Sequence, residues 1–224
     1  MADYTYWNKW VTPIFTSLDD TYNEKQSIKE CLTYYKSKDR VEVAGGIKGK
    51  LYESDFKFFQ TAERKNYRSL MNIKNFIGKQ FTTCFLDYFT KGYFPEDVSH
   101  HFDGISTDNV EVDIKESWVH ISNDKGSWHG NHDHPMTSWG AIYYVQVEET
   151  GGENGGQNTF RQPFDNMYSD DGNFFQHDYC LFTLKPTNGM LVLFPANLMH
   201  NAKPYYGSGK RIVIAANLCV NFKR

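Results

Sequence analysis

The C-terminal half of the chain consists of short runs in which apolar and polar residues alternate. A two-residue period is typical of β-strands that are buried on one face. Turn residues such as Gly151-Gly152, Asn154-Gly155-Gly156 and Asn188-Gly189 separate the runs. The pattern predicts strands at residues 110–114, 117–121, 141–147, 158–160, 179–184, 190–194, 202–205 and 211–220. Short strands with such turns favour a sandwich or jelly roll over a parallel α/β sheet.

The N-terminal half has a helical period instead. Ile28, Leu32 and Tyr35 recur at helical spacing and predict a helix over residues 21–38, capped by one of two preceding aspartates. A longer apolar stripe predicts a second helix over residues 61–90. Before both, residues 1–17 are aromatic and β-branched and contain a proline, which favours an edge strand.

These patterns predict a mainly β fold with α, of the α+β class. We expect residues 1–109 to form a helical and mixed portion that packs on a jelly-roll core of residues 110–224. The two portions are expected to form one integrated domain, although a separate N-terminal lobe stays open. Within the core, the polar loop over residues 162–177 contains aromatic residues. It is compatible with a lid that faces a partner and equally with a passive surface loop.

Composition narrows the function classes. Aromatic residues make up 17% of the 224 residues, enough for a large core and an aromatic cleft. The formal net charge of −3, with scattered Lys and Arg, argues against a dedicated nucleic-acid surface. Four widely spaced cysteines without a C-x-x-C pair predict free thiols in a reducing compartment. Because there is neither an N-terminal signal nor an apolar run of about 20 residues, we expect a cytoplasmic protein that does not enter the membrane.

Three histidines are candidate metal ligands. His132 and His134 are two residues apart on an extended segment, so their imidazoles point to the same side and Asp133 points away. Two nitrogens on one side are what a metal site needs from a strand end, with a third ligand from elsewhere. His200 lies between two strand-like runs and can supply that ligand. Chance surface histidines, and a buried His200 bonded to backbone, are the alternatives.

Arg211 opens an otherwise apolar strand. An unpaired buried charge is very costly, so this arginine needs a partner, and its planar fork suits a carboxylate. By strand alternation Arg211, Val213, Ala215 and Asn217 share one face. We expect Arg211 to hold a carboxylate deep in a pocket and Asn217 to offer a hydrogen bond near its mouth. The alternative is a salt bridge to an Asp or Glu of the chain itself.

Two adjacent tyrosines extend this candidate pocket. Tyr143 and Tyr144 point to opposite faces of their strand, and Ile142 shares the face of Tyr144. One tyrosine is expected to bond the carboxylate of a co-substrate while the other packs in the core. Packing roles for both tyrosines are the alternative.

The order and spacing of these motifs resemble the 2-oxoglutarate (2OG)- and Fe(II)-dependent oxygenases. The resemblance is strongest to a subgroup of bacterial and phage proteins with an H-x-H-P…Y-Y-V…F-P…H…R pattern, and it covers roughly residues 110–222. The residues that carry it are Ser117-Trp118, His132-Asp133-His134-Pro135, Trp139 to Val145, Gly189-Met190-Leu191, Leu193-Phe194-Pro195, His200, Arg211 and Asn217.

This resemblance implies a double-stranded β-helix, jelly-roll and cupin-like, with helices packed on one side. Ferrous iron would be held by the three histidines. 2OG would chelate the iron and pair its distal carboxylate with Arg211, with Ile142, Tyr144 and Asn217 also in its site. Trp118, His120, Tyr143 and Asp133 are further candidates. The reaction would use O₂ to hydroxylate a substrate, for which we expect an amino-acid side chain of a protein or peptide, and release succinate and CO₂.

One departure from the family pattern keeps alternatives open. Most members have H-x-D or H-x-E, whereas here His134 stands in the carboxylate's place, and a rearranged loop could use Asp133 instead. A cupin-like three-histidine dioxygenase without 2OG is the second reading, against which Arg211 argues. The third is a non-catalytic jelly-roll binding module. The sequence leaves the oligomeric state open, a homodimer included, and a phage-encoded protein would act in the host cytoplasm.

Overall fold

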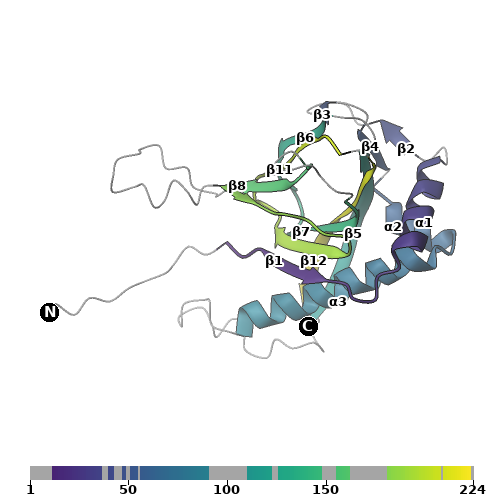
Figure 1. The fold of residues 1–224 in the computed structure, drawn as a ribbon. Coiled ribbons are helices and arrows are strands. Elements are labelled where there is room, and N and C mark those ends of the chain that lie inside the picture. Colours follow the sequence, from purple (N-terminus) through teal and green to yellow (C-terminus); the bar gives the residue numbers. More distant parts are fainter. Residues whose placement is uncertain are drawn as a thin grey trace, which may run out of the picture.

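A computed structural model describes residues 12–36, 40–42, 47–48, 51–54, 56–90, 110–122, 126–147, 155–161, 181–207 and 209–222 (Figure 1). Its helices are α1 (Glu24–Lys36), α2 (Phe58–Arg64) and α3 (Arg68–Thr90). Its strands are β1 (Phe15–Leu18), β2 (Arg40–Glu42), β3 (Ile47–Lys48), β4 (Leu51–Ser54), β5 (Val110–Ser122), β6 (Ser127–His132), β7 (Trp139–Gln146), β8 (Asn158–Arg161), β9 (Leu181–Thr183), β10 (Met190–Pro195), β11 (His200–Tyr205) and β12 (Arg211–Phe222).

The strands form two antiparallel sheets. The larger sheet has the order β1-β10-β7-β12-β5-β4-β2, and the smaller has the order β3-β6-β11-β8-β9. Figure 1 shows the helices on one side of the larger sheet and the smaller sheet on the other. The mainly β, antiparallel fold class expected from the alternating runs is therefore confirmed.

The larger sheet is buried on both faces, and alternate residues of its central strands serve two different cores. On β7, Tyr143 and its alternate neighbours pack with the helices, while Ile142 and Tyr144 pack between the sheets. The same division holds on β12, where Ile214 faces the helices and Val213 faces the smaller sheet. A strand that is covered on both faces has a nearly continuous apolar sequence. The face toward the smaller sheet is the one that carries the candidate site.

Strand β5 differs from the prediction of two separate strands at residues 110–114 and 117–121. It is continuous but contains a β-bulge, because Asn217 pairs with Glu116 whereas the next residue, Leu218, pairs with Ile114. The extra residue, Lys115, reverses the alternation. Ile114 therefore packs with the helix-side core, whereas on the other side of the bulge the even-numbered residues Trp118, His120 and Ser122 face the smaller sheet.

The prediction of one helix over residues 61–90 is wrong. The chain forms α2 and α3 with a break between them, where Asn66 adopts a positive φ of 55°. Asparagine tolerates this left-handed conformation, which a continuing helix cannot contain. The apolar stripe that predicted the helix begins at Tyr67, after the break, so the helical period gave no support for extending α3 back to residue 61.

Other expectations fall partly outside the described residues. The polar loop over 162–177 and Cys180 lie there entirely, whereas Cys31, Cys84 and Cys219 are free thiols as predicted. Burial raises the pKa of the Cys31 and Cys84 thiols. Among the described helices, none combines the length and apolar character that crossing a membrane requires.

Candidate metal centre

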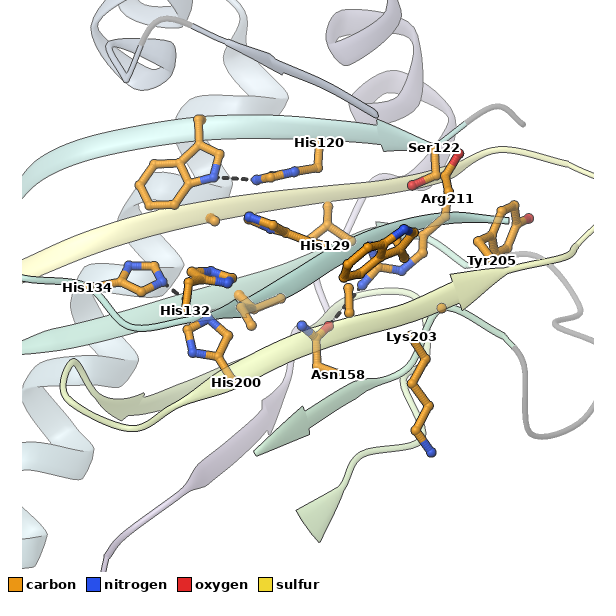
Figure 2. Close-up of a pocket in the computed structure, with 18 residues that line it drawn as sticks. His120, Ser122, His129, His132, His134, Asn158, His200, Lys203, Tyr205 and Arg211 are labelled. Atoms are coloured by element: carbon orange, nitrogen blue, oxygen red, sulfur yellow. Dashed lines mark hydrogen bonds between the residues drawn. The ribbon is translucent and has the colours of Figure 1, made fainter. Parts of the chain in front are cut away.

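The structure brings the three predicted histidines together. His132 ends β6, His134 follows in the next turn, and His200 begins β11 directly opposite His132. The backbone N–H of His134 donates to the carbonyl of Ala196 at 2.9 Å, which fixes the turn against the segment before β11. One ring nitrogen from each histidine lies within 4.8 Å of the other two (Figure 2). The H-x-H pair and the distant third histidine thus form one cluster.

All three rings are held in the same tautomer. The Nδ1 atoms of His132 and His200 lie 2.8 and 3.0 Å from the backbone carbonyls of Gly130 and Leu198. A carbonyl oxygen only accepts, so each Nδ1 carries the proton and each Nε2 carries a lone pair. This arrangement is how proteins usually orient a histidine that binds a metal through Nε2.

His134 reaches the same state through a side chain. Its Nδ1 lies 2.5 Å from Oδ1 of Asn217, whose Nδ2 donates to Oε2 of Glu116 at 2.6 Å. Because the carboxylate can only accept, it identifies Nδ2 as the end of the amide that faces Glu116. Oδ1 therefore faces His134 and accepts its proton. The three Nε2 lone pairs consequently lie in one small volume.

The spacing of two of these atoms suits a bound cation. Nε2 of His134 and Nε2 of His200 are 3.2 Å apart. When both carry lone pairs they cannot hydrogen-bond to each other, and they repel unless a cation lies among them. A divalent ion about 2.1 Å from each nitrogen, with the two bonds roughly 100° apart, separates them by about 3.2 Å. The donor set therefore fits a metal ion without rearrangement.

Burial keeps these rings neutral. It lowers the pKa of His132 and His134, and together with the neighbouring His132 it lowers the pKa of His200 to about 2. Neutral imidazole is the form that binds metals, so near pH 7 protons do not compete for the site.

The histidine cluster forms one end of a pocket with about 520 Å³ of empty space. In Figure 2 His132, His134 and His200 gather at one end and Arg211 lies at the other, with His129 and Asn158 between them. Among the described residues that line the pocket there is no Asp or Glu. The pocket therefore combines a candidate cation site with a fixed positive charge.

Arg211 is buried, with 4% of its surface exposed, and it has no anionic partner among the described residues. Its Nη2 donates to Oδ1 of Asn158 at 2.9 Å, whereas its buried Nε has no hydrogen bond there. The ion pair that the described residues do form joins Lys74 to Glu63. Burial lowers the pKa of Arg211, since the charged form is poorly solvated. The expected alternative of an internal salt bridge is thus not found in this part of the chain, and the geometry favours an external carboxylate.

Gly156 makes room for this arginine, and sequence reasoning missed it. Its φ is +67°, and a Cβ atom built there would lie 2.8 Å from Cδ of Arg211. The glycine-rich connection was visible in the sequence, but only the packing shows that one of its glycines touches the arginine. Asn158, which bonds the guanidinium, was also missed because a polar residue at a strand start is common.

The other predicted residues fall into two groups. Ile142 lines the pocket, and the hydroxyl of Tyr144 donates to Oδ1 of Asn158 at 2.6 Å, which places it beside Arg211. Tyr143 faces the helices and donates to Oδ2 of Asp19 at 3.0 Å. Asp133 is exposed and is not part of the histidine cluster. The amide of Asn217 bonds His134 and Glu116, so it is not a pocket-lining residue.

Trp118, His120 and His129 also line the pocket beside the three clustered histidines. The indole N–H of Trp118 donates to Nε2 of His120, and its ring stacks on His134 with centroids 5.5 Å apart. His129 stacks on His132 at 4.0 Å. A β-bulge explains this stacking, because His132 and His129, three residues apart on β6, pair with residues only two apart on β11. Strand alternation alone would have sent the two rings to opposite faces.

The C-terminal half matches a known family. Residues 116–217 match the model of the family described as "Putative 2OG-Fe(II) oxygenase". This segment resembles a 2OG-Fe(II) oxygenase domain. It contains the three clustered histidines and Arg211, and it begins and ends at Glu116 and Asn217. No curated protein matches the chain.

Solved structures share the fold. A prolyl hydroxylase in complex with a hypoxia inducible factor oxygen degradation domain peptide fragment from Trichoplax adhaerens is 12% identical and has a TM-score of 0.54, covering 93% of this chain and 83% of its own. The non-heme alpha ketoglutarate dependent epimerase SnoN from nogalamycin biosynthesis is 12% identical with a TM-score of 0.55, covering 95% and 82%. An oxidoreductase of the 2OG-Fe(II) oxygenase family from Burkholderia pseudomallei is 11% identical and has a TM-score of 0.37. The match covers 49% of this chain and 44% of that protein, so this chain spans less than half of its length. The first two show that the fold is that of the 2OG oxygenases, a double-stranded β-helix.

Replacing Gly156 should disturb the arginine end of the pocket. Gly156→Ala forces a left-handed conformation on an L-residue and places a Cβ against Arg211, so the free energy of unfolding should fall by about 1–2 kcal/mol or more. Gly78→Ala is a matched control, because its Cβ meets nothing within 4 Å in a helix and should be neutral or stabilising. Denaturant titration measures both. Equal effects of the two substitutions would contradict the close packing of Gly156 on Arg211.

The buried imidazoles should make the metal-free protein acid-sensitive. The pKa of His129 is lowered to about 3 by burial and by His132, and that of His200 is lowered to about 2. Below pH 6.5 the unfolded chain therefore binds protons that the folded chain does not, so stability is lost as the pH falls from about 6.5 toward 3. Each such group contributes up to about 1.4 kcal/mol per pH unit. Unfolding of chelator-treated protein between pH 7.5 and 4.5 measures the slope, which His129→Gln should make shallower. An identical slope in that variant would show that His129 titrates normally.

Proposed function

We propose that the protein is a 2OG- and Fe(II)-dependent dioxygenase. In this proposal His132, His134 and His200 hold Fe(II), and Arg211 binds the distal carboxylate of 2OG. One observation carries it, namely that a buried guanidinium without a described anionic partner shares a pocket with three convergent imidazole lone pairs. A dicarboxylate with a chelating oxo-acid group at one end satisfies both ends of that pocket.

The charges support a dianionic ligand. Three neutral imidazoles leave the two positive charges of the metal uncompensated. Arg211 adds another positive charge, and no acidic residue is found in the lining that the structure describes. The two carboxylates of 2OG offset most of this excess. Three protein ligands also leave three positions on a six-coordinate ion, enough for a bidentate chelate and O₂.

The chain's own residues bind and orient the co-substrate. Asn158 is bonded by both Arg211 and the hydroxyl of Tyr144, so the guanidinium is held in one orientation at the pocket's depth. Ile142 and the small apolar residues of β12 line the wall and exclude water. Bound iron with 2OG would supply the oxidising chemistry, in which one oxygen atom of O₂ enters a substrate C–H bond and the other enters succinate, with release of CO₂.

The substrate we propose is an amino-acid side chain of a protein or peptide. The support is that a prolyl hydroxylase with a bound peptide fragment shares the fold over most of both chains. The epimerase with the same fold acts in nogalamycin biosynthesis, which makes a small-molecule substrate the other outcome of a substrate screen.

We also infer that residues 1–109 and 110–224 form one integrated jelly-roll domain with the helices packed on one side. The support is that β1, β2 and β4 belong to the same sheet as β5 and β10. In addition, α2 and α3 contact β5, and α1 contacts β7.

A three-histidine dioxygenase that needs no 2OG is the second candidate. The observation in its favour is that the ligand cluster contains no carboxylate, because Asp133 is exposed and lies outside it. Such an enzyme has no use for a buried arginine without a described anionic partner at the far end of the pocket. The two candidates differ in whether 2OG binds to the metal-loaded protein.

Removing the arginine should weaken 2OG binding. Arg211→Met deletes a charge-assisted hydrogen bond worth about 1.5–3 kcal/mol, so the dissociation constant for 2OG should rise roughly tenfold or more. The metal-free variant should be no less stable than wild type, because Asn158 keeps the Tyr144 hydroxyl and the Asn201 carbonyl as partners. Calorimetric titration with 2OG measures the affinity, with exposed Arg161→Met as the control. An unchanged affinity in Arg211→Met would exclude this arginine as the anchor.

A further inference from the structure

A line of two hydrogen bonds runs outward from the metal-facing ring of His134. Its Nδ1–H donates to Oδ1 of Asn217 at 2.5 Å, and Nδ2 of Asn217 donates to Oε2 of Glu116 at 2.6 Å. Asn217 is only 6% exposed, whereas Glu116 lies at the surface. The buried amide thus connects a surface carboxylate to the ring.

The sheet places Glu116 where it can make this contact. Asn217 of β12 and Glu116 of β5 are directly paired. The β-bulge at Lys115 lies immediately before Glu116 in the chain. Because the bulge reverses the alternation, Ile114 packs with the helix-side core, whereas Glu116 lies on the same side of the sheet as its partner Asn217. The adjacent Ser117 is anchored in the other direction, since its N–H donates to the carbonyl of Phe56 at 2.8 Å.

The orientation of the Asn217 amide decides whether His134 can bind a metal. With Oδ1 toward the ring, Nδ1 is protonated and Nε2 presents a lone pair. A flipped amide would present Nδ2–H to the ring, so Nδ1 would have to accept and Nε2 would carry the proton. A protonated Nε2 cannot coordinate a metal. Glu116 can only accept, so it opposes the flip.

The carboxylate of Glu116 also brings negative charge toward a histidine cluster that contains no acidic group. The clustered ligands are three neutral imidazoles, and Asp133 is exposed outside the cluster. Glu116 is the acidic group that reaches the cluster through hydrogen bonds among the described residues. Hydrogen-bonded groups behind a metal ligand raise its basicity and metal affinity.

We propose that Glu116 is a positioning residue that acts through Asn217. It holds His134 in the metal-binding tautomer and supplies from outside the coordination sphere the negative charge that this all-histidine ligand set lacks. The proposal rests on the metal site of the proposed function and adds the residues that control it.

Substitutions at position 116 should act in a graded order. Glu116→Gln can either donate or accept, so the bias on the amide is lost, and the dissociation constant for Co(II) should rise about tenfold. Glu116→Lys can only donate, which favours the flipped amide, so its affinity should be lower still. Glu111→Gln is the matched control, because Glu111 is exposed on the same strand and also pairs with an asparagine, Asn221.

A paired substitution separates the relay from a general charge effect. In Glu116→Gln/Asn217→Asp the carboxylate moves to position 217, where it accepts from His134 directly and from the new glutamine amide. This variant should recover most of the Co(II) affinity lost in Glu116→Gln. If Glu116 acted only as a surface charge through space, the Co(II) affinity would not depend on a hydrogen bond between the side chains at positions 116 and 217.

The test is chelator-competition titration of the full chain with Co(II), combined with long-range ¹⁵N–¹H NMR of the histidine rings in the metal-free protein. We expect an Nδ1-protonated His134 in wild type and Glu111→Gln, and a mixture of tautomers in Glu116→Gln. Thermal unfolding checks that the variants fold. Wild-type affinity together with a wild-type tautomer in Glu116→Gln would overturn the proposal and leave the metal site standing. If wild-type protein binds no Co(II), both this inference and the proposed function fail.

Discussion

Three nitrogen lone pairs directed into one small buried volume repel one another unless a cation lies among them. The rest of the site follows from this constraint. Backbone carbonyls fix the rings of His132 and His200, and an amide fixes that of His134, so each Nε2 atom is the free one. At the other end of the pocket the opposite problem arises, because Arg211 is a buried cation without a described anion. A divalent metal together with a dicarboxylate resolves both.

The fold supports this arrangement through its central sheet and two irregularities of register. The larger sheet is covered by helices on one face, which leaves its other face free to present Arg211, Val213 and Ala215 to the pocket. The bulge in β6 turns His129 onto the same side as His132, and the bulge in β5 falls at Lys115, next to Glu116. Both lie beside the site, where bulges commonly redirect side chains.

The sequence predicted much of this structure, because the relevant signals are local. The H-x-H spacing, the position of His200 between two apolar runs and an arginine within an apolar strand each carry their own physical meaning. The missed features depend on contacts between distant segments. Only the strand register shows that His129 stacks on His132 or that Asn217 bonds His134. Likewise, only the packing shows that Gly156 touches Arg211. The break at Asn66 precedes Tyr67, where the apolar stripe begins, so the helical period could not show where α2 ends and α3 begins.

The most direct test of the account is anaerobic loading of the protein with Fe(II), followed by titration with 2OG while the visible absorption is recorded. Chelation of ferrous iron by the oxo-acid group produces a metal-to-ligand charge-transfer band. We expect this band to appear with about one equivalent of 2OG and to be absent in His200→Ala. Iron that binds without any such band would contradict the central claim and favour the dioxygenase that needs no 2OG, and an absence of iron binding would remove the metal centre itself.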